Sequence, residues 1–109
     1  MQLGEQRRAE IAFRTALKLR PDYVEALGNL GKLFIDQGRP RNALVVLNRA
    51  ILLKPDYAEG LNSAGLALVP ESKLAEALAM FDRAIRVRPN YVNAINSKGV
   101  VLKEMVRYD

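Results

Sequence analysis

The sequence repeats itself at a fixed interval of 34 residues. The clearest markers are three turn-like segments at that interval, Pro21-Asp22-Tyr23, Pro55-Asp56-Tyr57 and Pro89-Asn90-Tyr91. Small and large apolar residues keep the same interval: Gly31, Gly65 and Gly99, and Phe13, Leu47 and Phe81. An interval of this size indicates one supersecondary unit stacked on copies of itself. A stack of helical units has a groove, and such a groove more often binds a partner than performs chemistry.

Composition narrows the class of protein further. The chain has 109 residues, 50% hydrophobic and 27% charged, which is typical of one soluble domain and not of a disordered segment. No apolar stretch is long enough to span a bilayer, and residues 1–5 begin no secretory signal. Cysteine and histidine are absent, which removes the commonest metal ligands, nucleophiles and proton carriers. We therefore expect no enzyme activity, metal, cofactor or membrane contact, and a cytoplasmic location.

Each full period predicts two helices, here called A and B in chain order. Asp22 is a candidate N-cap for the first A helix, with Glu25 as its reciprocal partner in a capping box. Gly38 predicts a left-handed stop at about residue 37. Pro40 suits the first turn of the B helix, because no backbone donor is needed there. Pro55 then ends the B helix, because proline offers no donor and disfavours helix just before it.

The second period departs from the first at its turn between helices. Pro70 stands where the first period has Asp36, so the A helix should end near Val69. Ser72 is then a candidate cap for a B helix over about residues 73–87. Since this turn lacks a glycine, we expect residues 70–72 to adopt a different geometry from the first turn.

The two ends of the chain are out of phase with the repeat. Residues from about Glu5 to Leu19 match only a B helix, and residues from about Val92 to Val106 match only an A helix. The predicted fold is therefore all-α, with six helices in the order B-AB-AB-A. We expect a single domain over 1–109, divided into a half unit (1–23), two full units (24–57 and 58–91) and a half unit (92–109).

The half units predict apolar surface left uncovered at both ends. The residues concerned are Ile11, Ala12, Leu19, Ile95, Val101, Leu102 and Met105. Exposed patches of this kind mark interfaces. One interpretation is a homo-oligomer formed head to tail, in which the last helix of one molecule pairs with the first helix of another. The alternative is that the chain is a fragment of a longer array.

The spacing of small and apolar residues resembles the tetratricopeptide repeat (TPR) family. The matching residues are Leu27, Leu30, Gly31, Phe34, Ala43, Leu47, Ala50 and Pro55 in the first unit, and Leu61, Ala64, Gly65, Leu68, Ala77, Phe81, Ala84 and Pro89 in the second. The resemblance implies a right-handed superhelical solenoid whose concave wall is lined by A helices. It also implies that an extended peptide or partner segment binds along that wall.

In that family's geometry, polar side chains follow one another along the concave wall. The candidate binding residues are Asn29, Lys32, Asn62, Ser63, Leu66, Asn93, Asn96, Ser97 and Val100. Asparagine both donates and accepts hydrogen bonds, so it suits recognition of a peptide backbone without a demand for one side chain. The alternatives are that these polar residues only solvate the surface, and that the apolar strip with Leu66 and Val100 packs on neighbouring A helices.

These features predict a protein-interaction scaffold. The first alternative is a substrate-positioning arm of a larger enzyme, because the row Asn29, Ser63 and Ser97 partly resembles the asparagine ladder of O-linked glycosyltransferases. The clamp that other TPR proteins use for chaperone tails is absent, because Lys32 is the only cation at the corresponding positions. Nucleic acid is a third and disfavoured partner, since Glu10 and Asp82 interrupt the basic residues of the B helices.

Overall fold

The computed structural model describes residues 3–107, and over that range it contains six α-helices and no strand. Their bounds are α1 (Leu3–Leu19), α2 (Val24–Asp36), α3 (Pro40–Leu53), α4 (Ala58–Leu68), α5 (Leu74–Val87) and α6 (Val92–Arg107). The order confirms the prediction: α1, α3 and α5 are B helices, and α2, α4 and α6 are A helices. None of these six helices is long and apolar enough to cross a membrane.

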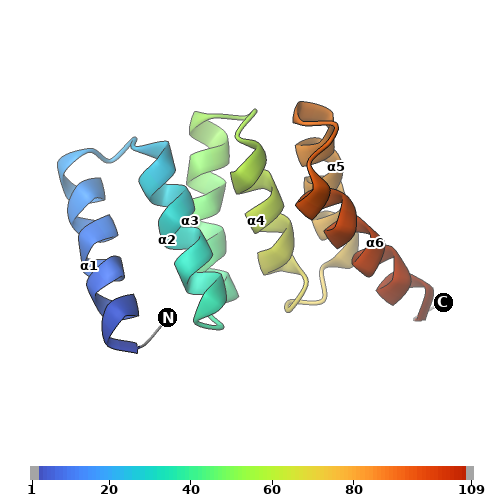
Figure 1. The fold of residues 1–109 in the computed structure, drawn as a ribbon, viewed down its shortest axis with the longest axis horizontal. Helices are drawn as coiled ribbons and strands as arrows, with labels where there is room; N and C mark the ends of the chain where they lie inside the picture. The colour runs from blue at the N-terminus through green and yellow to red at the C-terminus, as the bar shows by residue number, and fades with distance from the viewer. Residues whose placement is uncertain (1–2, 108–109) are drawn as a thin grey trace.

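The helices stack side by side in a solenoid that measures 45 × 28 × 20 Å (Figure 1). Each A helix of a full unit packs on its own B helix, and each B helix also packs on the next A helix. Successive A helices approach closely, whereas within residues 3–107 no Cα atoms of two B helices lie within 8 Å of each other. The stack therefore curves toward the A helices, which form its inner layer.

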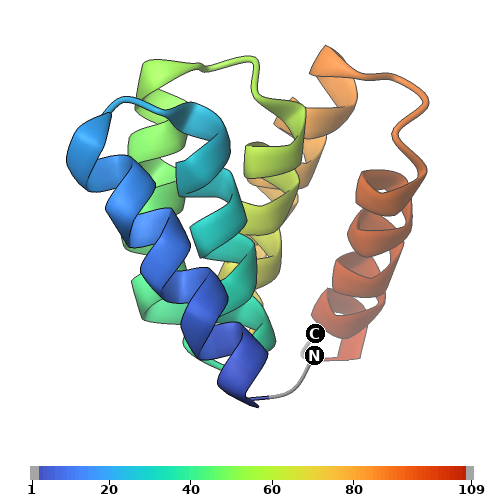
Figure 2. The same cartoon turned by 60° about the vertical axis from the view of Figure 1, so that its left-hand side comes forward.

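The three turns that carry the repeated tyrosine lie at the same end of the stack (Figures 1 and 2). The N-caps of α2 and α4 are Tyr23 and Tyr57, and neither helix has a side-chain cap. The capping box expected from Asp22 is therefore wrong, and Asp56 at the equivalent position is not a cap either. Each turn is closed instead by the backbone, because the tyrosine N–H donates to the carbonyl three residues earlier, at 3.1 Å for Tyr23 and Tyr57 and at 3.0 Å for Tyr91. Asp22 and Asp56 therefore lie one residue before the N-cap position of their helices.

The two turns between the helices of a unit share one geometry. Gly38 has φ of +70°, as predicted, and Ser72, one period later, has φ of +59°. In both turns the next residue, Arg39 or Lys73, donates its N–H to the carbonyl five residues earlier, at 2.8 and 3.2 Å. The expectation of a different second turn is wrong, because the packing of the flanking helices fixes the turn and the serine adopts a conformation that glycine prefers.

The ends of the helices around the second turn follow from that geometry. Helix α4 ends at Leu68 with Val69 as its C-cap, close to the predicted end. Helix α5 begins at Leu74, and its N-cap is Lys73 without a side-chain hydrogen bond. Ser72 is therefore not a cap, and the prediction that it starts the helix is wrong.

Close approach of helices within a unit depends on glycine. A Cβ atom placed on Gly31 would lie 2.5 Å from Cγ of Leu47, and one placed on Gly65 would lie 2.5 Å from Cε1 of Phe81. Leu47 and Phe81 are both fully buried. Each unit thus packs a large apolar residue of its B helix into the gap left by a glycine of its A helix, which is the basis of the 34-residue pattern.

Candidate functional site

The inner layer carries a hollow of about 360 Å³ that spans all three A helices. It is lined by Lys32, Ile35 and Asp36 of α2, Glu59, Asn62, Ser63 and Leu66 of α4, Tyr91 before α6, and Asn93, Asn96 and Ser97 of α6. We call this the central hollow. It brings together seven residues named as candidates from the sequence: Lys32, Asn62, Ser63, Leu66, Asn93, Asn96 and Ser97. Their role in binding stays a prediction.

The two other candidates lie beside the central hollow. Asn29 lines an adjacent hollow of about 370 Å³ together with Lys32 and Ser63, which line both hollows. Val100 lines a third hollow of about 640 Å³, near Val69 and the turn between α4 and α5. The structure therefore places Asn29 next to the main group of polar side chains and Val100 apart from it.

Asn62 is the most constrained polar side chain of the central hollow. It is 7% exposed, the one buried polar or charged residue among those described. Its Oδ1 atom is buried and has no hydrogen-bond partner within residues 3–107. A buried acceptor without a partner costs free energy, and such atoms are rare in folded proteins. Asn62 lines the central hollow while its unpaired oxygen is buried beneath the surface, which makes this side chain the feature most in need of a functional explanation.

Two tyrosines line the hollows and were missed as site residues. Burial raises the pKa of Tyr57 and of Tyr91, and the carboxylate of Glu59 adds to both effects. Arg88 and a hydrogen bond from Asn62 oppose the rise for Tyr91. Both phenols therefore remain neutral near pH 7 and can donate or accept hydrogen bonds in the groove.

A sequence signal for these tyrosines existed. In each of the three turns a basic residue stands three positions before the tyrosine. The cation lies over the ring in every case, at 4.6 Å for Arg20 and Tyr23, 5.8 Å for Lys54 and Tyr57, and 4.6 Å for Arg88 and Tyr91. The repeated pair of cation and aromatic ring could have identified the tyrosines as a fixed element at the edge of the groove.

Other polar groups of the central hollow are already paired in part. The Ser97 hydroxyl donates to the backbone carbonyl of Asn93 at 2.8 Å, so its oxygen is left to accept. Arg88 forms an ion pair with Glu59. Within residues 3–107 no group of three or more acidic side chains is placed to hold a metal ion. The central hollow therefore offers amides, hydroxyls, one lysine and two carboxylates, a set suited to hydrogen bonding.

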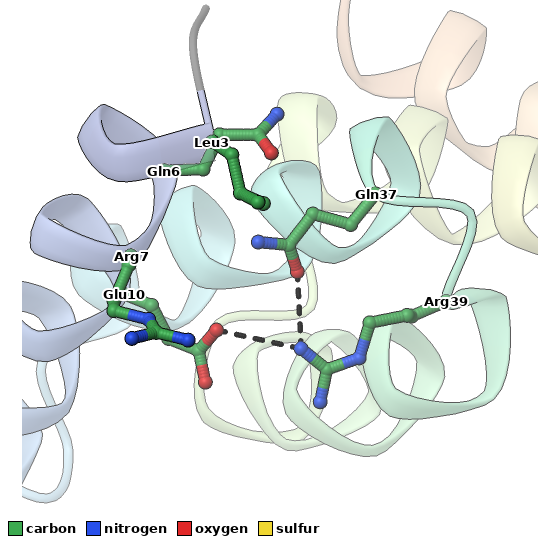
Figure 3. Close-up of a pocket in the computed structure, with 6 residues that line it drawn as sticks. All are labelled: Leu3, Gln6, Arg7, Glu10, Gln37 and Arg39. Carbon is green, nitrogen blue, oxygen red and sulfur yellow. Dashed lines mark hydrogen bonds and ion pairs between the residues drawn. The ribbon is translucent and has the colours of Figure 1, made fainter.

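A separate hollow of about 380 Å³ lies between α1 and the turn from α2 to α3 (Figure 3). Arg39 Nη1 donates to Glu10 Oε1 at 3.4 Å and to Gln37 Oε1 at 3.0 Å. Arg14 Nε donates to Glu10 Oε2 at 2.9 Å, and this bond is the main cause that lowers the pKa of Glu10. Because these groups satisfy one another, we interpret this hollow as a link between neighbouring units and not as the site.

Comparison with known families identifies the repeat. A sequence profile described as "Tetratricopeptide repeat" matches residues 1–63, which is more than half of the chain. The chain belongs to the tetratricopeptide repeat family. A search of curated proteins found no match. The family assignment agrees with the solenoid of helix–turn–helix units and with the placement of the polar hollow on the A helices of this TPR chain.

Solved structures place the TPR chain among several proteins of the same fold. A Thermobaculum terrenum O-GlcNAc transferase mutant is 31% identical with a TM-score of 0.83, covering 85% of this chain and 18% of the transferase chain. MamA is 30% identical with a TM-score of 0.84, covering 94% of this chain and 56% of MamA. The first TPR of Spaghetti (RPAP3), bound to an HSP90 peptide, has a TM-score of 0.90 over 94% of this chain and 82% of its own, at 19% identity. The last of these shows a shared fold alone.

Proposed function

We propose that this TPR chain binds an extended peptide or partner segment in the central hollow. The observation that carries the proposal is the Asn62 side chain, which lines the hollow and whose buried Oδ1 lacks a partner within residues 3–107. An N–H group of a bound peptide would satisfy it. The comparison with the RPAP3 domain, whose structure includes an HSP90 peptide, supports peptide binding as a use of this fold.

The chemistry of the wall favours recognition of the peptide backbone. Asn93, Asn96 and Ser97 lie across the hollow from α4 and present amide and hydroxyl groups, which can serve either the N–H or the C=O of an extended chain. Lys32 is the only cation that lines the central hollow, and two acidic residues, Asp36 and Glu59, line it as well. This balance disfavours a ligand held mainly by its carboxylates, and it favours tolerance of different side chains.

The proposal assigns binding without catalysis to this chain. The groups of the central hollow are amides, hydroxyls, a lysine, carboxylates and a tyrosine phenol, and no hydroxyl there is hydrogen-bonded to a base that would activate it. A second candidate is an arm that positions substrates for a larger enzyme. The 31% identity with the O-GlcNAc transferase mutant favours it, and the match covers 18% of that protein, so only a short part of such an enzyme would correspond.

Binding is tested with peptides selected from a random library of unstructured 12-residue sequences. The affinity of a selected peptide is measured by fluorescence anisotropy for the wild type and for Asn62→Ala and Asn96→Ala. We expect each substitution to weaken binding by about fivefold to tenfold, the equivalent of one hydrogen bond of about 1 kcal/mol. Asn48→Ala is the matched control, because Asn48 is exposed on α3 and lines none of the inner hollows.

A second probe separates backbone recognition from side-chain recognition. N-methylation of single peptide bonds removes one N–H donor at a time, and it should weaken binding at the bond that faces Asn62. Equal affinity of Asn62→Ala, Asn96→Ala and the wild type for every selected peptide would remove the central hollow from the proposal. Binding that survives methylation at every position would contradict backbone recognition.

A further inference from the structure

The glycine gap that each full unit fills is empty on α6 within residues 3–107. Gly31 faces Leu47 and Gly65 faces Phe81, each at a distance that leaves no room for a Cβ atom. Gly99 holds the same repeat position on α6, and nothing among the described residues lies within 4 Å of a Cβ placed there. Helix α6 thus presents the A-helix side of a unit without the B helix that packs on it elsewhere.

The side chains around Gly99 show the same vacancy. Ile95 is 46% exposed and Leu102 is 42% exposed. Their counterparts one and two periods earlier are almost completely buried: Leu27 2%, Leu61 0%, Phe34 2% and Leu68 6%. This Gly99 face points away from the peptide-binding side of α6, because the groove residues Asn93, Asn96 and Ser97 occupy other helical positions. The prediction that Val101 and Met105 are also uncovered is wrong, since Val101 is buried and both pack near α5.

Helix α1 carries the complementary surface. Phe13 stands at the repeat position of Leu47 and Phe81, the residues that fill the glycine gaps. Ala9 and Ala16 stand at positions where both full units have a fully buried alanine. All three are only partly buried, because α1 packs on α2 alone. Helix α1 thus has the residues of a B helix that packs on an A helix, and no A helix of its own among residues 3–107.

We propose that α1 of a second copy packs on α6 and places its Phe13 against Gly99. The repeat register argues for this occupant, because α1 offers a large residue and flanking alanines in B-helix positions and has no preceding A helix among residues 3–107. The two surfaces lie at opposite ends of a stack 45 Å long (Figure 1), so one molecule cannot join them to each other. The contact is heterologous and builds open chains of molecules. This interface is separate from the groove and goes beyond the proposed peptide binding.

Disulfide trapping tests the register directly, since the chain contains no cysteine. Gly99→Cys and Phe13→Cys are made as separate variants, mixed and oxidised, and the products are separated without reductant. The proposal expects a covalent dimer that contains one copy of each variant. Thr15→Cys replaces Phe13→Cys in the matched control, because Thr15 is exposed on the same helix two residues away. Equal yields from both mixtures, or no dimer from either, would overturn the proposed contact.

The association itself is measured by light scattering over a concentration series. The wild type should increase in mean mass with concentration, and Gly99→Leu should remain monomeric, because leucine fills the gap that Phe13 would enter. Circular dichroism and retained peptide affinity verify that the Gly99→Leu variant is folded with an intact groove. A wild type that stays monomeric throughout, or a Gly99→Leu variant that associates equally, would refute the proposal and leave the groove function standing.

Discussion

Replacement of Ser72 by glycine should stabilise the protein. Ser72 is the only non-glycine residue among those described with a positive φ, at +59°. Its equivalent in the first unit, Gly38, has almost the same backbone conformation without a Cβ atom to strain it. The serine is exposed, and its hydroxyl makes no hydrogen bond within residues 3–107 that the substitution would remove.

The size of the effect follows from two opposing contributions. A left-handed conformation costs a residue with a Cβ atom about 1–2 kcal/mol. Glycine recovers this cost, but it makes the unfolded chain more flexible, which costs about 0.5–1 kcal/mol. The net gain in unfolding free energy is about 0.5–1 kcal/mol, and for a domain of this size the melting temperature should rise by about 3–6 °C.

Thermal and urea unfolding, followed by circular dichroism in dilute solution, measure the gain. Ser72→Ala is the control for loss of the hydroxyl, and it should bring no stabilisation because alanine keeps the Cβ atom. The reciprocal change Gly38→Ser should lower stability by a similar amount. If Ser72→Gly leaves the melting temperature unchanged, or Ser72→Ala raises it equally, strain at this turn is not the reason for the effect.

Two further predictions concern packing and pH. Gly31→Ala should destabilise the protein by about 1–3 kcal/mol, because its Cβ would press on Leu47 in a filled core. Gly99→Ala, whose Cβ meets no described residue, should stabilise the monomer by up to about 1 kcal/mol through helix propensity. Urea unfolding measures both variants, and a change of stability in the same direction for both would contradict this reasoning. Burial raises the folded-state pKa of Tyr57 and Tyr91 above the ordinary 10.0, so the stability from their neutral form is complete below about pH 10 and is lost as pH rises through the higher folded pKa. Melting temperature should therefore fall above pH 10 and fall less for Tyr57→Phe, and identical alkaline profiles would show that this phenol does not contribute.

The fold was accessible from the sequence because its determinants are local and periodic. The spacing of Gly31, Leu47 and their repeats predicted which helix faces meet, and Pro40 and Gly38 marked helix ends by their backbone preferences. The candidate groove residues followed from the same register, since seven of them line one hollow. Repetition helped because each structural position occurs in more than one period, so an atypical residue in one period can be recognised by comparison with the others.

The errors arose where tertiary packing overrides the preference of a single residue. Asp22 is a good N-cap residue by type, yet the backbone bond at Tyr23 closes the turn and leaves the aspartate outside. Ser72 disfavours positive φ by type, yet it adopts this conformation because the turn between α4 and α5 has the same backbone geometry as the turn between α2 and α3. Val101 appeared uncovered by sequence position, yet it is buried against α5.

The sequence by itself determined the number, order and facing of the helices, because these depend on an interval of 34 residues that any reader can count. Only the tertiary structure decided which polar atoms lack a partner and which apolar faces lack a cover. Asn62 looks like any other asparagine in the sequence, and Gly99 looks like Gly31. What distinguishes Asn62 from other asparagines, and Gly99 from Gly31, is which side chains of other helices surround it. Burial, unlike periodicity, is a property of the folded chain.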